Sequence, residues 1–116
     1  MTTHKGGCHC GKVAYEFDAD IGTVMECNCS FCQKRGALLQ FIPASAFRLL
    51  TAADDLGTYR FSKHVIAHHF CKTCGIDPFS EGTDPKGNKM VAINMRCVEG
   101  AEPRELDIKF FNGRDL

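Results

Sequence analysis

Three cysteines fall within six residues of this chain, with the spacing C-x-C-x-x-C at Cys27, Cys29 and Cys32. Thiols this close in sequence cannot all pair with one another, and a C-x-C pair forms a strained disulfide ring. If the backbone turns once, however, the three sulfur atoms can converge on one soft metal ion. Three thiolates around Zn²⁺ leave the fourth tetrahedral position free, which is typical of a reactive site rather than a closed structural one.

The chain has eight cysteines among 116 residues, and their use depends on the redox compartment. Residues 1–7 are polar and lack the apolar segment of a secretory signal. No apolar run approaches the length of a membrane span. We therefore expect a cytoplasmic protein in a reducing environment, where clustered cysteines bind metal rather than form disulfides.

Two further cysteine pairs lie far from the triplet and from each other. Cys8 and Cys10 have glycines on both sides, which lets the backbone fold tightly around a ligand. Cys71 and Cys74 form a C-x-x-C motif followed by Gly75, which is typical of a zinc knuckle. The two pairs can meet across a sheet as a closed four-thiolate site, although the spacing also allows the second pair to join the triplet. Either arrangement predicts a zinc protein.

One isolated cysteine and three histidines are the remaining candidate ligands. Cys97 stands at the end of a predicted strand and is either a small buried apolar residue or a fourth ligand that closes the triplet. His9, His68 and His69 lie beside cysteine motifs. We interpret them as residues that hold a ligand in place or lie on the surface, rather than as ligands themselves. His68 and His69 point to opposite sides of their strand.

Positive charge next to the triplet is the main electrostatic feature. Lys34 and Arg35 follow Cys32 and either attract an anionic substrate or occupy a solvated turn. The whole chain has 14 basic and 14 acidic residues, and its charge becomes slightly negative once seven thiolates hold two zinc ions. Because there is no basic run, we expect no nucleic-acid partner.

Short apolar segments separated by turn residues predict a mainly β fold. Alternating apolar residues indicate a half-buried strand over residues 12–18. Further strands are expected over residues 23–26, 37–42, 47–51, 58–61, 65–70, 90–95 and 107–111. Residues 34–36 are expected to form a turn, and residues 43–47 one helical turn. The core is expected to contain most of Phe41, Phe61, Phe70, Phe79, Phe110 and Phe111. With no repeat, long helix or linker, residues 1–116 are interpreted as a single domain.

Three stretches, taken in order, resemble the motifs of one known family. Residues 7–11 (GCHCG), 27–32 (CNCSFC) and 70–75 (FCKTCG) are similar to motifs of the glutathione-dependent formaldehyde-activating enzyme family, which includes centromere protein V. Residues 94–97 (NMRC) resemble the stretch before the last strands of that family. The similarity runs from about His4 to Phe111.

The resemblance implies a β-tent fold of antiparallel sheets held by two zinc sites. It implies a structural site formed by Cys8, Cys10, Cys71 and Cys74. It also implies a catalytic zinc site formed by Cys27, Cys29 and Cys32. The activity of the family is carbon–sulfur lyase chemistry on S-hydroxymethylglutathione, so the implied partner is a small-molecule thiol such as glutathione.

The favoured hypothesis is therefore an enzyme in which a substrate thiol takes the free position on the zinc ion of the triplet. Binding to the metal stabilises thiolate over thiol, so the nucleophile exists at neutral pH. The thiolate adds to formaldehyde, and the reverse reaction breaks the carbon–sulfur bond of the adduct. Glu26, His68 and His69 are the candidates for a base, alongside zinc-bound water.

Two other hypotheses explain the same cysteines without lyase chemistry. A non-catalytic protein-binding module predicts a fourth ligand on the triplet, such as Cys97, and no cavity beside the metal. A thiol redox sensor predicts a reversible disulfide within the triplet that releases zinc. No feature of the sequence requires a particular oligomeric state.

Overall fold

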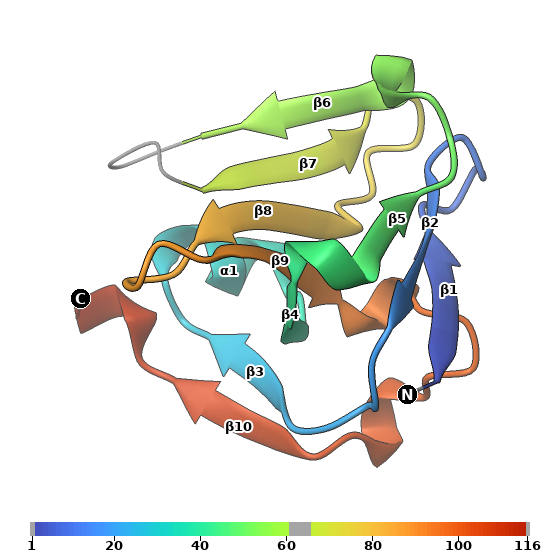
Figure 1. The fold of residues 1–116 in the computed structure, drawn as a ribbon. Coiled ribbons are helices and arrows are strands. Elements are labelled where there is room, and N and C mark those ends of the chain that lie inside the picture. The colour runs from blue at the N-terminus through green and yellow to red at the C-terminus, as the bar shows by residue number, and fades with distance from the viewer. Residues whose placement is uncertain (1, 61–65, 116) are drawn as a thin grey trace.

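A computed structural model describes residues 2–60 and 66–115 of the chain. In these ranges the chain forms ten strands in two sheets, one α-helix and several short 3₁₀ turns, which confirms the predicted mainly β fold (Figure 1). The smaller sheet is antiparallel and has the strand order β1 (Thr3–Gly7), β2 (Ala14–Asp18) and β5 (Phe47–Leu49). None of the described helices has the length and apolar content that a membrane span requires.

The larger sheet has seven strands and brings the triplet to one of its ends. Its order is β10 (Ile108–Phe111), β3 (Val24–Cys27), β4 (Leu39–Pro43), β9 (Lys89–Asn94), β8 (Phe79–Thr83), β7 (Ala67–Cys71) and β6 (Leu56–Tyr59). Neighbouring strands are antiparallel except for β10 and β3, which run parallel with Phe111 opposite Cys27. Because parallel strands end at the same edge, the chain that follows β10 lies beside the triplet.

The two faces of the larger sheet pack against different hydrophobic clusters. Val91 and Ile93 of β9 belong to the main core, which they share with Tyr15 and Phe17 of the smaller sheet. Ala92 points to the opposite face, as strand alternation requires, and packs in a small second cluster with Cys32, Ala37 and Leu39. The triplet therefore lies on the face of the sheet that is turned away from the main core.

A short helix, α1 (Ser30–Arg35), stands where the sequence predicted a turn over residues 34–36. Cys29 is its N-cap, and the sulfur of Cys29 accepts a hydrogen bond from the backbone N–H of Cys32 at 3.3 Å. Gly36 ends the helix with φ at +70°, a left-handed conformation that glycine adopts without strain. The prediction was wrong for residues 34 and 35, while Gly36 is in a turn, because a helix of fewer than two turns is too short to display a 3.6-residue period.

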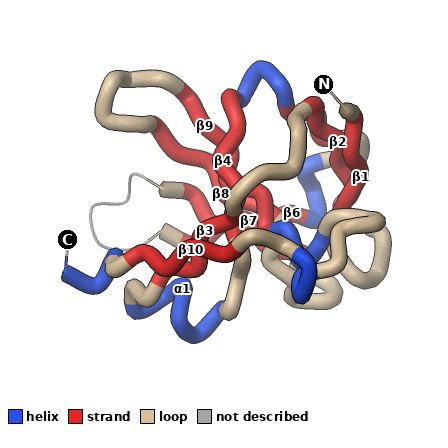
Figure 2. Tube along the Cα trace, turned by 90° about the horizontal axis from the view of Figure 1, so that it is seen from below, coloured by secondary structure: helices blue, strands red, loops and turns tan. Residues whose placement is uncertain are grey.

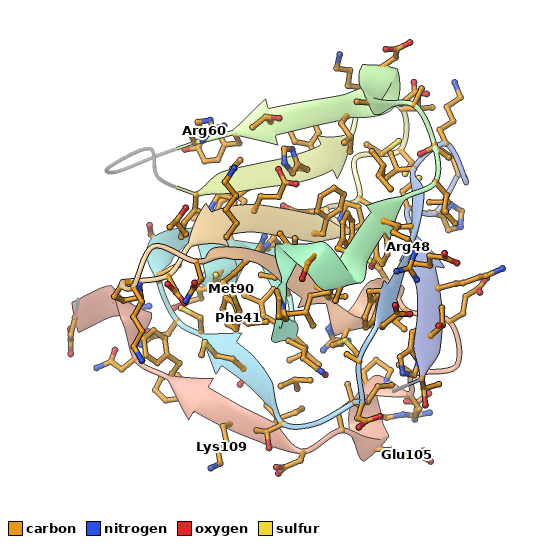
Figure 3. The ribbon with its side chains drawn as sticks, viewed as in Figure 1. Phe41, Arg48, Arg60, Met90, Glu105 and Lys109 are labelled. Atoms are coloured by element: carbon orange, nitrogen blue, oxygen red, sulfur yellow. The ribbon has the colours of Figure 1, made fainter. Side chains whose placement is uncertain are left out.

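Several phenylalanines expected in the core lie at the surface instead. Phe79 is buried, but Phe41 is 49% exposed and Phe110 is 65% exposed. Phe41 and Met90 are labelled on β4 and β9 in Figure 3, on neighbouring strands of the larger sheet. Phe61 lies outside the described residues, as does Val65 at the start of the strand expected over residues 65–70. Phe110 is exposed because it lies on the end strand β10, and Phe41 is exposed because it lies opposite Ala92, on the face turned away from the main core.

Candidate metal centres

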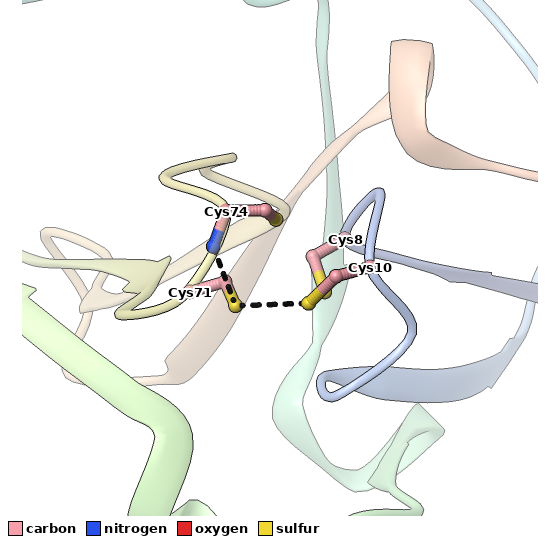
Figure 4. Close-up of side chains that lie close together, drawn as sticks. All are labelled: Cys8, Cys10, Cys71 and Cys74. Atoms are coloured by element: carbon pink, nitrogen blue, oxygen red, sulfur yellow. Dashed lines mark hydrogen bonds between the residues drawn. The ribbon is translucent and has the colours of Figure 1, made fainter.

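Four cysteine sulfur atoms meet where two loops face each other (Figure 4). Cys8 and Cys10 lie in the loop after β1, Cys71 ends β7, and Cys74 lies in the following turn. The Cys10 sulfur lies 3.7 Å from that of Cys8 and 3.6 Å from that of Cys71. A tetrahedral zinc ion with sulfur bonds of about 2.3 Å separates its ligands by about 3.8 Å. The four sulfur atoms therefore fit one zinc ion, and the second pair lies with the first rather than with the triplet.

Backbone N–H groups point at the sulfur atoms of this four-cysteine site. Val13 donates to the Cys8 sulfur at 3.3 Å, and Thr73 donates to the Cys71 sulfur at 3.4 Å. The backbone N–H of Cys74 helps to lower the pKa of Cys71, and that of Ile76 helps to lower the pKa of Cys74 to about 6. Such hydrogen bonds favour the ionised thiolate, which is the form that binds zinc.

The triplet also brings its sulfur atoms together. Cys27 ends β3, Cys29 caps α1 and Cys32 lies within α1, and their three sulfur atoms lie within 4.8 Å of one another. Across the described ranges, no fourth ligand atom from a Cys, His, Asp or Glu residue joins this group. The three-cysteine site can thus hold a metal ion and leave a coordination position unfilled by the described protein ligands.

Each sulfur atom of the three-cysteine site receives one N–H hydrogen bond. The backbone N–H of Cys29 donates to the Cys27 sulfur at 3.4 Å, that of Cys32 donates to Cys29, and Arg35 Nη2 donates to the Cys32 sulfur at 3.4 Å. Burial raises the pKa of Cys32 to about 12. Burial also acts to raise the pKa of Cys29, but hydrogen bonds from α1 outweigh it and lower that pKa. Cys29 is therefore the more readily ionised of these two thiols.

Arg35 carries a buried positive charge next to this site. Its side chain is 8% exposed, and its Nη1 atom lies 3.2 Å from the carboxylate of Asp77 and 3.2 Å from the hydroxyl of Ser80. The guanidinium also lies over the ring of Phe31, at 4.7 Å from the centroid. The sequence allowed either a substrate-attracting cation or a solvated turn here. The structure instead shows Arg35 joining the Cys32 sulfur to β8 and to the loop that carries Asp77.

His68 lies beside Arg35, and its imidazole is neutral at pH 7. Its Nδ1 atom is 3.0 Å from the hydroxyl of Ser80 and 3.4 Å from Arg35 Nη1. Burial lowers the pKa of His68 to about 4, with smaller contributions from the charges of Arg35 and His69. Burial raises the pKa of Asp77, although the charge of Arg35 opposes this effect. The group thus combines the ion pair of Arg35 and Asp77 with an imidazole that is neutral at pH 7.

Two cavities adjoin this buried pair, and both are lined by Arg35, Gly75 and Asp77. One has a volume of about 530 Å³, and its other lining residues are Phe31, Lys34, Tyr59 and Phe70. The other has a volume of about 610 Å³ and extends toward the four-cysteine site; its lining includes Cys8, His9, Arg96 and Cys97. Both volumes fall in the range of small-molecule sites.

The other candidates from the sequence lie away from the triplet. Cys97 shares a cavity with Cys8, and burial raises its pKa to about 11. His69 is hydrogen-bonded through Nδ1 to the Thr58 hydroxyl and through Nε2 to the Glu81 carboxylate, each at 3.0 Å. Glu26 is exposed and, by strand alternation, points to the face opposite Cys27. None of these residues belongs to either sulfur cluster.

Sequence reasoning missed two groups that act on the triplet. Asp77 balances the charge of Arg35, which contacts the Cys32 sulfur. The C-terminal turn was not considered at all, although the position of Gly113 brings its backbone against the Cys27 sulfur. Asn28, between the first two cysteines of the triplet, contacts this turn through its side chain, but no local sequence pattern indicates that contact.

Comparisons with known proteins agree with this geometry. The profile of the family described as glutathione-dependent formaldehyde-activating enzyme matches residues 3–113, which include both cysteine sites. A crystal structure of a Rhodobacter sphaeroides protein is similar to this chain at 32% sequence identity. The two structures superpose with a TM-score of 0.78, and the match covers 90% of this chain and 99% of that one.

Proposed function

The chain belongs to the glutathione-dependent formaldehyde-activating enzyme family, and on that premise we propose that it is a zinc-dependent carbon–sulfur lyase. Its substrate would be the adduct of formaldehyde and a small thiol, such as S-hydroxymethylglutathione. In the direction of addition, the thiol sulfur forms a bond to the carbon of formaldehyde, and the thiol proton ends on the former carbonyl oxygen. The reverse direction breaks that carbon–sulfur bond. The observation that carries the proposal is a set of three convergent sulfur atoms to which the described residues add no fourth ligand.

The residues of the triplet would hold the metal and set its charge. A zinc ion held by Cys27, Cys29 and Cys32 would supply the positive charge that keeps a substrate sulfur ionised at neutral pH. Arg35 donates to the Cys32 sulfur and so reduces the negative charge that this ligand presents. Asp77 in turn keeps Arg35 in place, which fixes the orientation of the ligand.

The cavity of about 530 Å³ is where we place the rest of the substrate. Phe31 lies between two ligands of the triplet in sequence and forms part of the wall of this cavity. Lys34 follows on the same helix and is exposed, so its ammonium group can meet a substrate carboxylate without first breaking a buried contact. The cavity therefore offers one cation at the rim and aromatic walls within, which suits a thiol that bears a carboxylate.

The rival hypothesis of a non-catalytic module made two structural predictions. It required a fourth ligand on the triplet, and it required that no cavity adjoin the metal. Cys97 lines the same cavity as Cys8, and its sulfur is not among those that converge in the three-cysteine site. A second cavity is lined by Arg35, which contacts the triplet directly. Both observations favour the enzyme.

The direct test compares Cys29→Ser with Cys97→Ser in the zinc-loaded full-length protein. The measurement is the exchange rate between ¹³C-formaldehyde and its glutathione adduct, followed by NMR with and without protein. We expect the original protein and Cys97→Ser to accelerate exchange, and Cys29→Ser to lose the acceleration together with one of two bound zinc ions. Unchanged exchange in Cys29→Ser, with circular dichroism like that of the original protein, would refute the mechanism.

A further inference from the structure

The C-terminal end of the chain meets the three-cysteine site because of the register of two strands. β10 runs parallel to β3 with Phe111 opposite Cys27, so both strands deliver their next residues to the same place. Beyond Phe111 the chain forms a short 3₁₀ turn, η5 (Gly113–Asp115), which lies near α1 in Figure 2. Sequence-distant segments thus meet at this edge of the sheet.

Asn28 binds this C-terminal segment through its backbone and through both ends of its side chain. Its backbone N–H donates to the carbonyl oxygen of Phe111 at 3.2 Å. Its amide Nδ2 donates to Asn112 Oδ1 at 2.9 Å, and its Oδ1 accepts from the backbone N–H of Arg114 at 3.0 Å. The Arg114 guanidinium also donates to the side chain of Gln33 on α1. The C-terminal segment is therefore held by residues on both sides of Cys29 in the sequence, Asn28 before it and Gln33 after it.

Gly113 is the point of closest approach to a sulfur atom. A Cβ atom at this position would lie 2.6 Å from the Cys27 sulfur and 3.3 Å from the ring of Phe111. The backbone of Gly113 is outside the left-handed region, so its conformation alone would admit other residues. Any larger residue would therefore force the Cys27 sulfur or the backbone of this turn to move.

We propose that residues 112–114 form one wall of the three-cysteine site and that Gly113 is a positioning residue for the Cys27 sulfur. This inference rests on the proposed metal site but not on any particular reaction. Gly113 lies against the Cys27 sulfur on one side, and Cys32 is buried with its sulfur contacted by Arg35. Ala92 and Leu39 close the side toward the sheet. Cys27 and Cys29 are both partly exposed, so a substrate sulfur enters on their side of the site rather than past the buried Cys32.

The test uses full-length protein loaded with ¹¹³Cd²⁺, because cadmium NMR resolves a four-sulfur site from a three-sulfur site. The main variant is Gly113→Ala. The matched control is Gly22→Ala, since Gly22 has no atom within 4 Å of its Cβ position and no left-handed backbone. We expect Gly113→Ala to shift the three-cysteine signal and to weaken cadmium binding there on the order of tenfold. The four-cysteine signal should stay in place in both variants.

A second variant covers the case in which Gly113→Ala does not fold. Asn28→Ala removes the two side-chain hydrogen bonds to the segment and adds no atom. It should shift the same cadmium signal, in a protein whose four-cysteine signal is unchanged. The original protein should give two cadmium signals. If it does and neither variant shifts the three-cysteine signal, residues 112–114 do not form a wall of that site, although the site binds metal. If the original protein gives only the four-cysteine signal, the proposed metal site fails, and the wall fails with it.

Discussion

The four-cysteine site joins loops from distant parts of the sequence, whereas the three-cysteine site is built within one short segment. Cys10 and Cys71 are 61 positions apart, and their sulfur atoms lie 3.6 Å from each other. Bringing such loops together costs chain entropy, which a metal ion can offset. The triplet needs only the end of β3 and the first turn of α1. The ligands of one site therefore come together only when distant loops meet, whereas the ligands of the other come from a single short segment.

The two sites also differ in their electrostatic surroundings. The hydrogen bonds to the Cys8 and Cys71 sulfur atoms come from uncharged backbone N–H groups. The triplet adds the buried guanidinium of Arg35, which Asp77 balances. A buried ion pair is costly to desolvate, so it is weak support for stability alone. Its position beside the less complete set of ligands indicates a functional purpose.

The largest expected effect is on stability, which the four-cysteine site should support much more than the three-cysteine site. Cys71→Ala removes a fully buried ligand of the four-cysteine site, and the binding energy of a structural zinc ion is part of the folding energy. We expect thermal unfolding, followed by circular dichroism, to shift downward by more than about 15 °C. Cys29→Ala should change the midpoint much less, because the triplet closes no long loop.

Zinc content measured on the same samples tests whether metal binding and folding are coupled at each site. Cys29→Ala should keep one zinc ion and a native spectrum, and Cys71→Ala should lose its secondary structure as it loses metal. Equal unfolding midpoints for the two variants would remove the distinction between a site that holds the fold and a site that does not.

Much of this comparison could be predicted from cysteine spacing. The C-x-C and C-x-x-C patterns restrict which sulfur atoms can converge, because metal geometry demands short distances between neighbouring ligands. Strand alternation likewise indicated the β-rich fold, since Tyr15 and Phe17 are buried on one face of β2. Spacing alone allows Cys71 and Cys74 to join either the pair of Cys8 and Cys10 or the triplet. That choice depends on strand order, which local sequence does not encode.

The parts of the site that sequence reasoning missed are contacts across the fold. Arg35 reads as one more charged residue after a cysteine motif, and only the position of Asp77 beside it explains its burial. Gly113 is one of 11 glycines, and its proximity to Cys27 follows from the parallel register of β10 and β3. Long-range pairing of this kind has no local period or motif.

The second prediction tests whether the buried ion pair of Arg35 and Asp77 supports metal binding at the three-cysteine site. Arg35→Met leaves the Asp77 carboxylate buried without its partner, which we expect to cost about 3–5 kcal/mol of unfolding free energy in urea titrations. Metal affinity at the triplet should fall by about 10–100-fold, because the contact to Cys32 is lost. The double variant Arg35→Met/Asp77→Leu should recover much of the stability but not the metal affinity.

Arg48→Met is the matched control for Arg35→Met. Arg48 also pairs with carboxylates, at 2.8 Å from Glu16 and 2.9 Å from Asp18, and its place on the smaller sheet is labelled in Figure 3. Its side chain is solvent-exposed, so water and salt screen these pairs and their loss should matter much less. If both arginine variants lose the same stability and neither changes metal binding, Arg35 has no special relation to the triplet.

The smallest expected effect concerns the pH dependence of the Arg35 group. His68 has a pKa of about 4 in the folded protein, below the usual value of 6.5, because it is buried and faces Arg35 and His69. Between these two values the unfolded chain binds a proton that the folded protein does not. The stability contributed by neutral His68 is therefore complete above pH 6.5 and is lost as the pH falls toward 4.

The measurement is the free energy of unfolding in urea at pH 7 and pH 5, for the original protein and for His68→Gln. Acid also protonates the cysteine ligands, but it does so in both proteins, so their difference isolates the histidine. The original protein should lose about 2 kcal/mol more than the variant over this interval. An equal loss would show that His68 takes up its proton without cost. The pH sensitivity would then belong to the cysteine sites alone, and the neutral imidazole beside Arg35 would not distinguish the three-cysteine site from the four-cysteine one.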